Sequence, residues 1–312
     1  MSDLPPSRFI SGLDMLGRGA TAWAFKLDQD IAIKYVRKGR LKEFQAENEM
    51  YDLFEKHGSS PYIVHSFFRL PGLNFMQLMS SGLDQRIYSN QRRDAKNLRC
   101  LEVLRLEPTP KVEQWAMELS GALAWLDSLG LVQGDLRPHN ILLDGNDHLK
   151  LADFDCVAKV GSRNPGNPPP WARLVPTDGF GMYGTTSEQF TFGSILYNLT
   201  HGCEPYEELD LDGNEVVDLL RLMKFPELSE STLDQVTLRC WHGDFESLAD
   251  LACEMASLDG AKTASRAVSF DEDYIAQMRE RCRKLLTGSL AGIDIAAVSS
   301  GEEERVSSHH RA

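Results

Sequence analysis

The most informative part of the sequence is residues 133–143, which read Gln-Gly-Asp-Leu-Arg-Pro-His-Asn-Ile-Leu-Leu. They place an acid, Asp135, and an amide, Asn140, five positions apart in a loop just before a predicted strand. A second motif, Asp153-Phe154-Asp155, follows 18 residues after Asp135. Carboxylate and amide oxygens suit Mg²⁺, which binds a few protein oxygens together with phosphate oxygens, and a further acid can take a hydroxyl proton. Asp and Asn are also common in turns and helix caps, but both motifs at this spacing favour a functional site.

The pattern of apolar residues divides the chain into a sheet-rich part and a helix-rich part. In the first part, residues 31–36 and 74–78 are predicted strands and residues 41–56 a predicted helix. From residue 83 the apolar spacing is mainly helical. The predicted features of this second part are helices around 112–126, 190–199 and 238–255, a hairpin with its turn at 144–147, and a long Gly- and Pro-rich loop over 161–178. The polar end of the chain, from about residue 287, is predicted to be a disordered tail.

A glycine-rich turn lies near the start of the chain, at Gly17-Arg18-Gly19-Ala20-Thr21-Ala22. Glycine lets backbone N–H groups approach phosphates closely, because no Cβ stands in the way. A predicted strand rather than a helix follows the turn, and no Gly-Lys-Ser/Thr completes it, which excludes the dinucleotide-binding fingerprint and the Walker A loop. On its own the pattern fits a plain hairpin turn as well as a phosphate-binding one.

A lysine, Lys34, stands inside the apolar strand predicted for residues 31–36. A buried lysine needs a partner to offset its lost hydration, and an outward-pointing lysine at a sheet edge is the alternative. The next helix offers an acid, because Glu47 falls in the middle of an apolar stripe that comprises Phe44, Met50, Tyr51 and Phe54. Glu47 is therefore the predicted partner of Lys34, and Glu43, near the helix start, is the weaker choice.

Composition limits the classes of protein to which the chain can belong. Its 312 residues include 33 Lys and Arg against 46 Asp and Glu, a net charge of −13, and 42% are hydrophobic. These values are ordinary for a globular protein of roughly two compact units, and they exclude a mostly disordered chain, a collagen-like chain and a coiled coil. The negative balance argues against a general nucleic-acid-binding protein, which needs a basic surface.

The sequence gives no targeting signal. Its first residues, Met-Ser-Asp-Leu-Pro-Pro, lack the basic and apolar regions of a secretory signal, and no stretch approaches the roughly 18 apolar residues of a membrane span. The six cysteines are scattered without a Cys-x-x-Cys pair, so we expect reduced thiols. The expectation is an intracellular protein, cytoplasmic or nuclear, with no membrane or nucleic-acid partner.

The order of the motifs resembles the eukaryotic protein kinase signature, in the set Gly17/Gly19, Lys34, Glu47, Asp135, Asn140 and Asp153. Residues 188–197 look like the helix that carries the family's Asp-x-Trp-Ser-x-Gly motif, and residues 200–206 look like the Gly-x-x-Pro-aromatic loop after it. Cys240-Trp241 resembles a cysteine–tryptophan pair found late in many kinase domains. The resemblance covers about residues 10–286 and is most similar to a group of fungal kinase-like proteins.

This resemblance implies an α+β, bilobal fold with a sheet-rich N-lobe over residues 10–79, a mainly helical C-lobe over 80–286 and a tail over 287–312. It implies an ATP- and Mg²⁺-dependent Ser/Thr protein kinase that acts on protein substrates. Arg137 resembles the lysine of Ser/Thr kinases and can neutralise the γ-phosphate. The other implied roles are phosphate cover for Gly17 and Gly19, α/β-phosphate binding for Lys34 paired with Glu47, catalytic base for Asp135, Mg²⁺ ligands for Asn140 and Asp153, and nucleotide contact at the gatekeeper Met76 and at Leu78 and Met79 near the hinge.

Several positions depart from the family pattern. Ala22 replaces the third glycine, Asp155 replaces the glycine of Asp-Phe-Gly, and Glu188 replaces an anchoring aspartate. Val175-Pro176-Thr177 stands where Ala-Pro-Glu is expected, and Gln133-Gly134 replaces His-Arg, which removes the cation that docks a phosphorylated activation loop. The last change predicts activity without loop phosphorylation. Two alternatives remain: a pseudokinase that serves as a nucleotide-binding or scaffold module, and a small-molecule kinase of the aminoglycoside or choline type.

Overall fold

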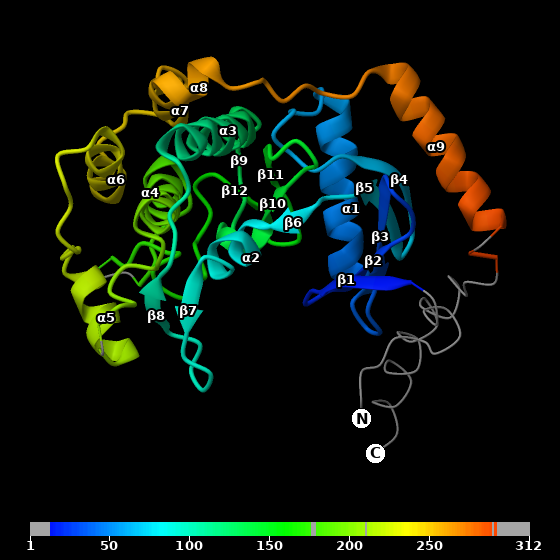
Figure 1. Ribbon diagram of the computed structural model, residues 1–312. Coiled ribbons are helices and arrows are strands. Elements are labelled where there is room, and N and C mark those ends of the chain that lie inside the picture. Colours follow the sequence, from blue (N-terminus) through cyan, green and yellow to red (C-terminus); the bar gives the residue numbers. More distant parts are fainter. Residues whose placement is uncertain (1–12, 176–178, 210, 289, 292–312) are drawn as a thin grey trace. The chain divides into compact units, whose positions relative to one another are not determined.

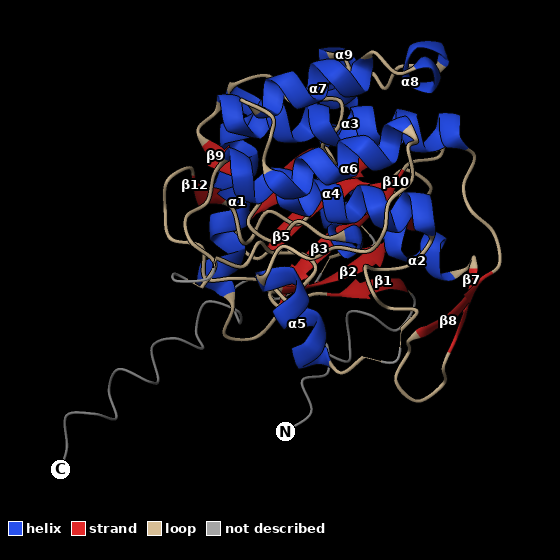
Figure 2. Ribbon diagram, turned by 90° about the vertical axis from the view of Figure 1, so that its left-hand side faces the viewer, coloured by secondary structure: helices blue, strands red, loops and turns tan. Residues whose placement is uncertain are grey.

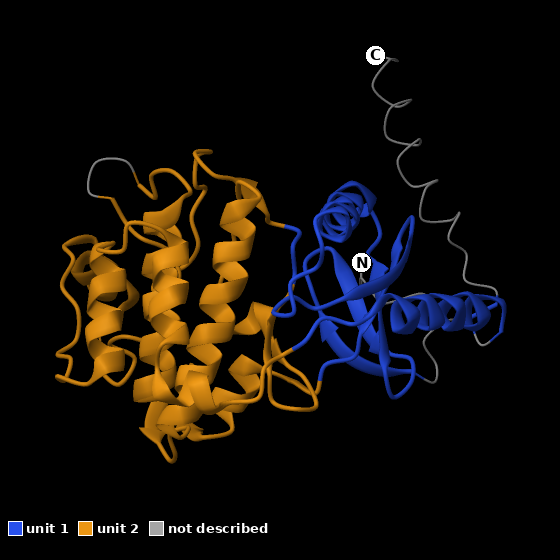
Figure 3. Cartoon of the chain, turned by 90° about the horizontal axis from the view of Figure 1, so that it is seen from above, with its two compact units in different colours: residues 1–79, 153–155, 268–312 blue, residues 80–152, 156–267 orange. Residues whose placement is uncertain are grey.

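The computed structural model describes residues 13–175, 179–209, 211–288 and 290–291. The chain divides into two compact units (Figure 3). Unit 1 takes in the chain up to Met79, the short segment Asp153–Asp155 and the chain from Val268 onward. Unit 2 takes in Ser80–Ala152 and Cys156–Ala267.

Unit 1 is built on one antiparallel sheet (Figure 1). In sheet order its strands are β1 (Asp14–Arg18), β2 (Ala22–Lys26), β3 (Ile31–Val36), β5 (Leu73–Gln77) and β4 (Ser66–Leu70). The strand predicted at 31–36 is present with those limits, and the strand predicted at 74–78 begins and ends one residue earlier. Apolar residues fill β3 and β5 because each strand lies inside the sheet and contributes side chains to both of its faces.

Helix α9 (Glu272–Thr287) covers one face of this sheet (Figure 1). Successive side chains of a strand point to opposite faces, so Ile31 and Ile33 of β3 share a face. These two isoleucines lie in one buried apolar cluster with Met278 and Cys282 of α9. The apolar stripe of α9 therefore completes the core of unit 1.

The position of α9 differs from the prediction that residues 80–286 form the second lobe. The sequence shows the apolar stripe of this helix but not the element against which the stripe packs. Arg281 of α9 also forms ion pairs with the turn before β3, with nitrogen–oxygen distances of 2.8 Å to Asp28 and 2.7 Å to Asp30. Thr287, where the predicted tail begins, is the last residue of α9, and nearly all of the remaining predicted tail lies outside the described residues.

Helix α1 (Leu41–Lys56) has the predicted limits and packs on the other face of the sheet. Its Phe44 shares a buried cluster with Val36 of β3. The buried residues of α1 follow helical spacing and are Phe44, Glu47, Asn48, Tyr51 and Phe54. The predicted stripe contained Met50, which is only partly buried, instead of Asn48, whose Nδ2 donates to Leu70 O at 3.2 Å.

Unit 2 is mainly helical (Figure 2). Its helices are α2 (Leu83–Tyr88), α3 (Thr109–Ser128), α4 (Thr185–His201), α5 (Gly213–Arg221), α6 (Thr232–His242), α7 (Leu248–Ala256) and α8 (Asp259–Thr263). Helix α4 packs against α3 and α6 and is buried on every side from Ser187 to Leu199. Gly193 permits the close approach of α6, because a Cβ there would lie 2.9 Å from Cys240 Cβ. The apolar stretch predicted over 238–255 forms parts of two helices, since Gly243, with φ of 77°, ends α6.

Short strands complete unit 2. The predicted hairpin is present as β10 (Ile141–Leu143) and β11 (Leu149–Leu151), and β6 (Ser81–Gly82) pairs with β10. The strands β9 (Leu131–Val132) and β12 (Ala158–Lys159) pair with each other, and the 3₁₀ turn η1 (Pro138–Asn140) lies between them in the sequence.

A hairpin of β7 (Gln91–Arg93) and β8 (Cys100–Val103) lies where the sequence predicted mainly helix. Where it is described, the predicted loop over 161–178 contains turns and isolated bridges. In the described ranges no helix has the length and apolar character of a membrane span.

Candidate active site

An ion pair between Lys34 and Glu47 joins β3 to α1. Lys34 Nζ lies 2.6 Å from Glu47 Oε1 and 2.7 Å from Asp153 Oδ1. Side chains alternate along β3, so Lys34 points away from Ile33 and toward the face that α1 covers. Burial alone would lower the pKa of Lys34, but the carboxylates of Asp153 and Glu47 outweigh burial and hold the pKa well above its usual value. Lys34 is therefore a fixed positive charge between two acids.

Aromatic packing anchors Phe154 in unit 1. Phe154 is 1% exposed, and its ring packs edge-on against Tyr51 and Phe54, with centroid distances of 5.5 and 5.0 Å. The Phe154 N–H donates to Glu47 Oε1 at 3.3 Å. The preceding residue, Asp153, has φ of 59°, in the left-handed region that Asp tolerates better than most residues. The buried phenylalanine thus fixes the backbone that presents Asp153 to the lysine.

The glycine-rich turn connects β1 to β2. Gly17 pairs with Ala24 after a bulge in β1, and the Gly19 N–H donates to Ala22 O at 2.9 Å. Arg37 supports the turn, because its Nη1 donates to Gly19 O at 2.8 Å. Ala22, in place of a third glycine, is 3% exposed and lies in a buried cluster with residues of β3 and α1. Its methyl group is therefore buried in the core of unit 1.

A hydrogen bond links this turn to Asp155. The Thr21 hydroxyl Oγ1 donates to Asp155 Oδ2 at 3.4 Å. Glycine at position 155 has no side chain to accept this bond, so the link depends on the departure from the family pattern. The segment that presents Asp153 to Lys34 thus carries a second carboxylate, that of Asp155, which contacts the glycine-rich turn.

The predicted gatekeeper and hinge residues lie along β5 and the chain after it. Met76 is 5% exposed and pairs with Ala32 of β3. The Leu78 N–H donates to Asp30 O at 2.8 Å, which continues the sheet pairing one residue beyond β5. Leu78 and Met79 are both partly exposed at this end of unit 1.

In unit 2 the predicted catalytic loop precedes β10. Asn140 is 2% exposed, and its Nδ2 donates to Asp135 O at 2.8 Å and to Asp135 Oδ2 at 2.9 Å. Arg137 Nη2 lies 3.1 Å from the same carboxylate oxygen. The Asp135 N–H donates to Gln133 Oε1 at 2.6 Å. The loop therefore holds the Asp135 carboxylate with an amide and a guanidinium.

Position 134 requires glycine. Gly134 has φ of 81°, and a Cβ there would lie 2.0 Å from Cys156 O. Its carbonyl oxygen accepts hydrogen bonds from Tyr183 Oη at 3.0 Å and from Asn167 Nδ2 at 3.1 Å. Two neutral hydrogen bonds thus fasten Asn167 of the long loop, and Tyr183 a few residues after it, to the catalytic loop at the position where the family's arginine is missing.

The model of the Protein kinase domain matches residues 12–275. The chain belongs to the protein kinase domain family. It is similar to Citron Rho-interacting kinase of Homo sapiens, with 30% identity over 159 residues, or 46% of this chain and 8% of that protein. It is also similar to Serine/threonine-protein kinase OXI1 of Arabidopsis thaliana, with 27% identity over 172 residues, or 53% of this chain and 41% of that protein. The Insulin-like receptor of Caenorhabditis elegans is 24% identical over 184 residues, or 55% of this chain and 10% of the receptor.

The family assignment agrees with the two units of the fold, one sheet-rich and one helical, as expected for a bilobal kinase. The matched stretches cover less than half the length of each of the three relatives. These relatives come from animals and a plant, so the predicted special similarity to fungal kinase-like proteins is not supported.

Glu188 of this kinase domain stands near the start of α4 in place of the family's aspartate. Burial raises the pKa of Glu188 to about 7, although a hydrogen bond with the Gln133 backbone opposes the shift. Glu188 is 4% exposed, and within the described ranges its Oε2 has no hydrogen-bond partner. The longer acid still reaches the backbone of the catalytic loop, but its second oxygen is buried without a hydrogen-bond partner in the described ranges.

The two predicted Mg²⁺ ligands carry oxygen atoms of the kind that Mg²⁺ prefers, the carboxylate oxygens of Asp153 and the amide oxygen of Asn140. Over the part of the chain that the structure describes, no group of three or more His, Cys, Asp or Glu side chains is placed to hold a metal. Such a group is not needed, because Mg²⁺ on a nucleotide keeps several waters and takes one or two protein oxygens with the phosphates. Taken one by one, the oxygen atoms of Asp153 and Asn140 therefore have the chemistry of ligands for nucleotide-bound Mg²⁺.

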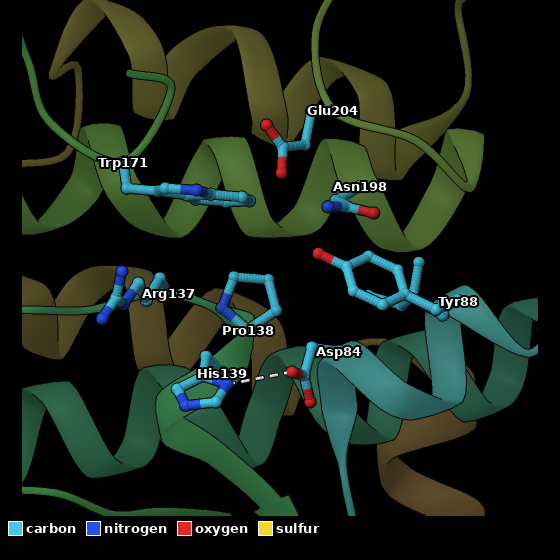
Figure 4. A pocket seen from close by; sticks show the side chains of 9 residues that line it. Asp84, Tyr88, Arg137, Pro138, His139, Trp171, Asn198 and Glu204 are labelled. Atoms are coloured by element: carbon cyan, nitrogen blue, oxygen red, sulfur yellow. Dashed lines mark hydrogen bonds and ion pairs between the residues drawn. The ribbon is translucent and has the colours of Figure 1, made fainter. Parts of the chain in front are cut away.

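A pocket in unit 2 was missed by sequence reasoning (Figure 4). It is a cavity of about 340 Å³ whose walls include Asp84, Trp171, Asn198 and Glu204. These residues come from α2, the loop before α4, α4 itself and the loop after it. No local sequence pattern marks the pocket, because only tertiary packing gathers such distant positions.

Proposed function

We propose that this kinase domain transfers the γ-phosphoryl group of ATP, with Mg²⁺, to Ser or Thr hydroxyl groups of protein substrates. The observation that carries the proposal is the Lys34–Glu47 ion pair at 2.6 Å, beside Asp153. In protein kinases this lysine–glutamate pair and the aspartate that binds the metal must both be in place for phosphoryl transfer.

The proposed roles follow the chemistry of each side chain. The acceptor hydroxyl oxygen forms a bond to the γ-phosphorus, while the bond from that phosphorus to the bridging oxygen of ADP breaks. Asp135 takes the hydroxyl proton, and Asn140 keeps its carboxylate in position through the bonds at 2.8 and 2.9 Å. Arg137 neutralises charge on the γ-phosphate, a role for which its guanidinium suits phosphate oxygens.

The nucleotide is proposed to contact residues of unit 1. Gly17 and Gly19 let the backbone of the turn approach the phosphates, and Lys34 binds the α- and β-phosphates. Met76, Leu78 and Met79 are the proposed neighbours of the adenine ring. Mg²⁺, when bound, offsets negative charge on the phosphate oxygens, and its proposed ligands are Asp153 and Asn140.

The choice of Ser and Thr as acceptors rests on Arg137, which stands where Ser/Thr kinases have lysine. OXI1 is a serine/threonine-protein kinase by name, which supports Ser and Thr, and Tyr is the competing acceptor that the test includes. The second candidate function is a pseudokinase, and the observation that favours it is the Thr21–Asp155 bond, which ties down the turn that must close over the phosphates.

The experiment that separates these functions is a transfer assay with purified chain, Mg²⁺ and ATP labelled on the γ-phosphate. Arms of the assay contain mixed proteins, Ser/Thr peptides, Tyr peptides, and the small alcohols choline and kanamycin. We expect label on Ser and Thr of proteins and peptides. Label on Tyr or on small alcohols only would overturn the proposed acceptor, and nucleotide binding without transfer in any arm would favour the pseudokinase.

A further inference from the structure

Two residues from other parts of unit 1, Arg37 and Asp155, hold the glycine-rich turn between β1 and β2. We propose that Asp155 is a positioning residue for the nucleotide, because through Thr21 it holds this turn in place before the nucleotide binds. The inference deepens the proposed kinase function and rests on it, since the turn is the proposed cover of the phosphates. The burial of Thr21, the fixed backbone at Asp155 and the contacts of Arg37 carry the inference.

Thr21 lies in the turn with its side chain buried. It is 7% exposed, whereas the residue before it, Ala20, is exposed. Its hydroxyl Oγ1 donates to Asp155 Oδ2 at 3.4 Å. A buried hydroxyl needs a hydrogen-bond partner, and this carboxylate supplies one. Thr21 therefore joins the turn to the segment Asp153–Asp155 and does not face solvent.

The backbone that carries Asp155 is fixed by the residue before it. Phe154 is 1% exposed, and its ring packs edge-on against Tyr51 and Phe54 of α1. The backbone at position 155 lies outside the left-handed region, so a residue with a side chain fits there without strain. The acceptor of the Thr21 hydrogen bond is therefore held in place by the core of unit 1.

The aspartate at position 155 also has an electrostatic cost. Lys34 Nζ already lies within 2.7 Å of two carboxylates, those of Glu47 and Asp153. Burial raises the pKa of Glu47, although Lys34 opposes the shift, and the charges of Asp153 and Asp155 add to it. Asp155 thus brings a third negative charge near a proposed phosphate site, where like charges repel. The hydrogen bond to Thr21 is the contact by which Asp155 offsets this cost.

Arg37, the residue after β3, holds the backbone of the same turn. Its N–H donates to Thr21 O at 2.8 Å, and its Nη1 donates to Gly19 O at 2.8 Å. Its guanidinium also lies 5.5 Å from the ring centroid of Trp23 in β2. A turn that is held at several points loses less conformational freedom when a ligand binds, so less of the binding free energy is spent on ordering it.

The first test measures the order of the turn without nucleotide. Hydrogen exchange of single backbone amides is followed by NMR in the wild type, in Thr21→Val, which lacks the hydroxyl, and in Thr21→Ser, which keeps it. The reporters are the Gly19 N–H, which closes the turn, and the Arg37 N–H, which donates to Thr21 O. We expect both amides to exchange about three- to tenfold faster in Thr21→Val, as for the loss of one hydrogen bond, and near the wild-type rate in Thr21→Ser.

The Leu27 N–H, which donates to Ile31 O in the turn between β2 and β3, is the internal control and should not change. Unchanged exchange at Gly19 and Arg37 in Thr21→Val would overturn the inference whether or not the chain is a kinase. The same acceleration at Leu27 would also overturn it, because the effect would then not be local to the glycine-rich turn.

The second test measures nucleotide binding and transfer. A fluorescent analogue of ADP is titrated, with Mg²⁺, into the wild type, Thr21→Val, Asp155→Gly and the double variant. We expect each single variant to raise Kd about three- to tenfold and the double variant to raise it no further, because both changes remove the same hydrogen bond. In the transfer assay KM for ATP should rise by the same factor in Thr21→Val, while the single-turnover rate at saturating ATP stays within about twofold of the wild type.

Tighter nucleotide binding in Thr21→Val would overturn the inference, because it would show that the hydrogen bond opposes the nucleotide. Strictly additive changes in the double variant would overturn the link between the two residues. Absence of nucleotide binding by the wild type would count against the kinase function, and the exchange test would then decide whether Asp155 holds the turn.

Discussion

Lys34 Nζ lies 2.6 Å from Glu47 Oε1, and this ion pair links β3, the central strand of unit 1, to helix α1. Glu47 is only 1% exposed, so its negative charge depends on the lysine. The alternation of β3 and the helical spacing of α1 make the two side chains face each other. The pair is therefore a feature of the fold and of the proposed phosphate site at the same time.

The first prediction concerns the cost of separating this pair. Lys34→Met should lower the free energy of unfolding by about 3 kcal/mol or more, because it leaves a buried carboxylate without its cation. The double variant Lys34→Met/Glu47→Gln should recover a large part of that loss, since it also removes the charge. Urea unfolding of the wild type, both single variants and the double variant measures the coupling. Strictly additive losses would show that the two side chains do not interact as described.

The second prediction uses the pH dependence of stability. The pKa of Glu188 is raised from 4.5 to about 7 by burial, so the folded state holds its proton more tightly than the unfolded chain. This group's contribution to stability is therefore greatest below pH 4.5 and is lost as the pH rises toward 7, by about 3 kcal/mol in total. Glu188→Gln should flatten the curve of unfolding free energy between pH 5 and 7, while the exposed control Glu246→Gln should leave the slope in place. An unchanged slope in Glu188→Gln would contradict the burial of its charge.

The third prediction tests the attachment of α9 to unit 1. Met278 is 2% exposed in the core under the sheet, so Met278→Ala should cost about 2–5 kcal/mol of unfolding free energy. Met15, which is 60% exposed on β1, offers a matched control, and Met15→Ala should change stability by no more than about 0.5 kcal/mol. Thermal and urea unfolding would measure both variants. Equal, small effects would mean that α9 does not cover the sheet in solution.

The fourth prediction concerns regulation by the long loop. Tyr183 and Asn167 donate hydrogen bonds to Gly134 O, and Gly134 stands where the family has the arginine that binds a loop phosphate. Transfer activity should therefore survive replacement of Thr177, Thr185, Thr186 and Ser187 with Ala, with kcat/KM within about twofold of the wild type. The same assay on Tyr183→Phe should show a larger loss, because one of the two neutral bonds is removed. Loss of activity in the Ala variant with its folding intact would indicate that loop phosphorylation is required.

The core of unit 1 and its ion pair were accessible from the sequence because each follows from local periodicity. β3 is marked by a run of apolar residues and α1 by apolar residues at helical spacing, and Glu47 stands out as an acid on that apolar stripe. The hairpin β7–β8 was missed because its strands are short and interrupted by charge. The sequence also shows the apolar stripe of α9 but does not say which surface that stripe covers.

The contacts that were not predicted join residues far apart in the chain. The Thr21–Asp155 bond spans 134 positions, and the pocket that holds Asn198 and Glu204 draws on four separate segments. Periodicity and motif spacing carry information over a few turns of helix or one hairpin, and beyond that range the packing of the whole unit decides which side chains meet. A family resemblance does not supply these contacts either, because Asp155 departs from the pattern.

The central claim is that Asp135 takes the proton of the acceptor hydroxyl in a phosphoryl transfer from ATP. The most direct measurement is the single-turnover rate of γ-phosphoryl transfer to a Ser peptide by the wild type and by Asp135→Asn, with the exposed Asp244→Asn as control. Asp135→Asn should keep its nucleotide affinity but transfer phosphate about 10²–10⁴-fold more slowly, which is the usual contribution of a general base to the rate. Asp244→Asn should transfer phosphate at the wild-type rate. A folded Asp135→Asn variant that transfers phosphate at the wild-type rate would contradict the account.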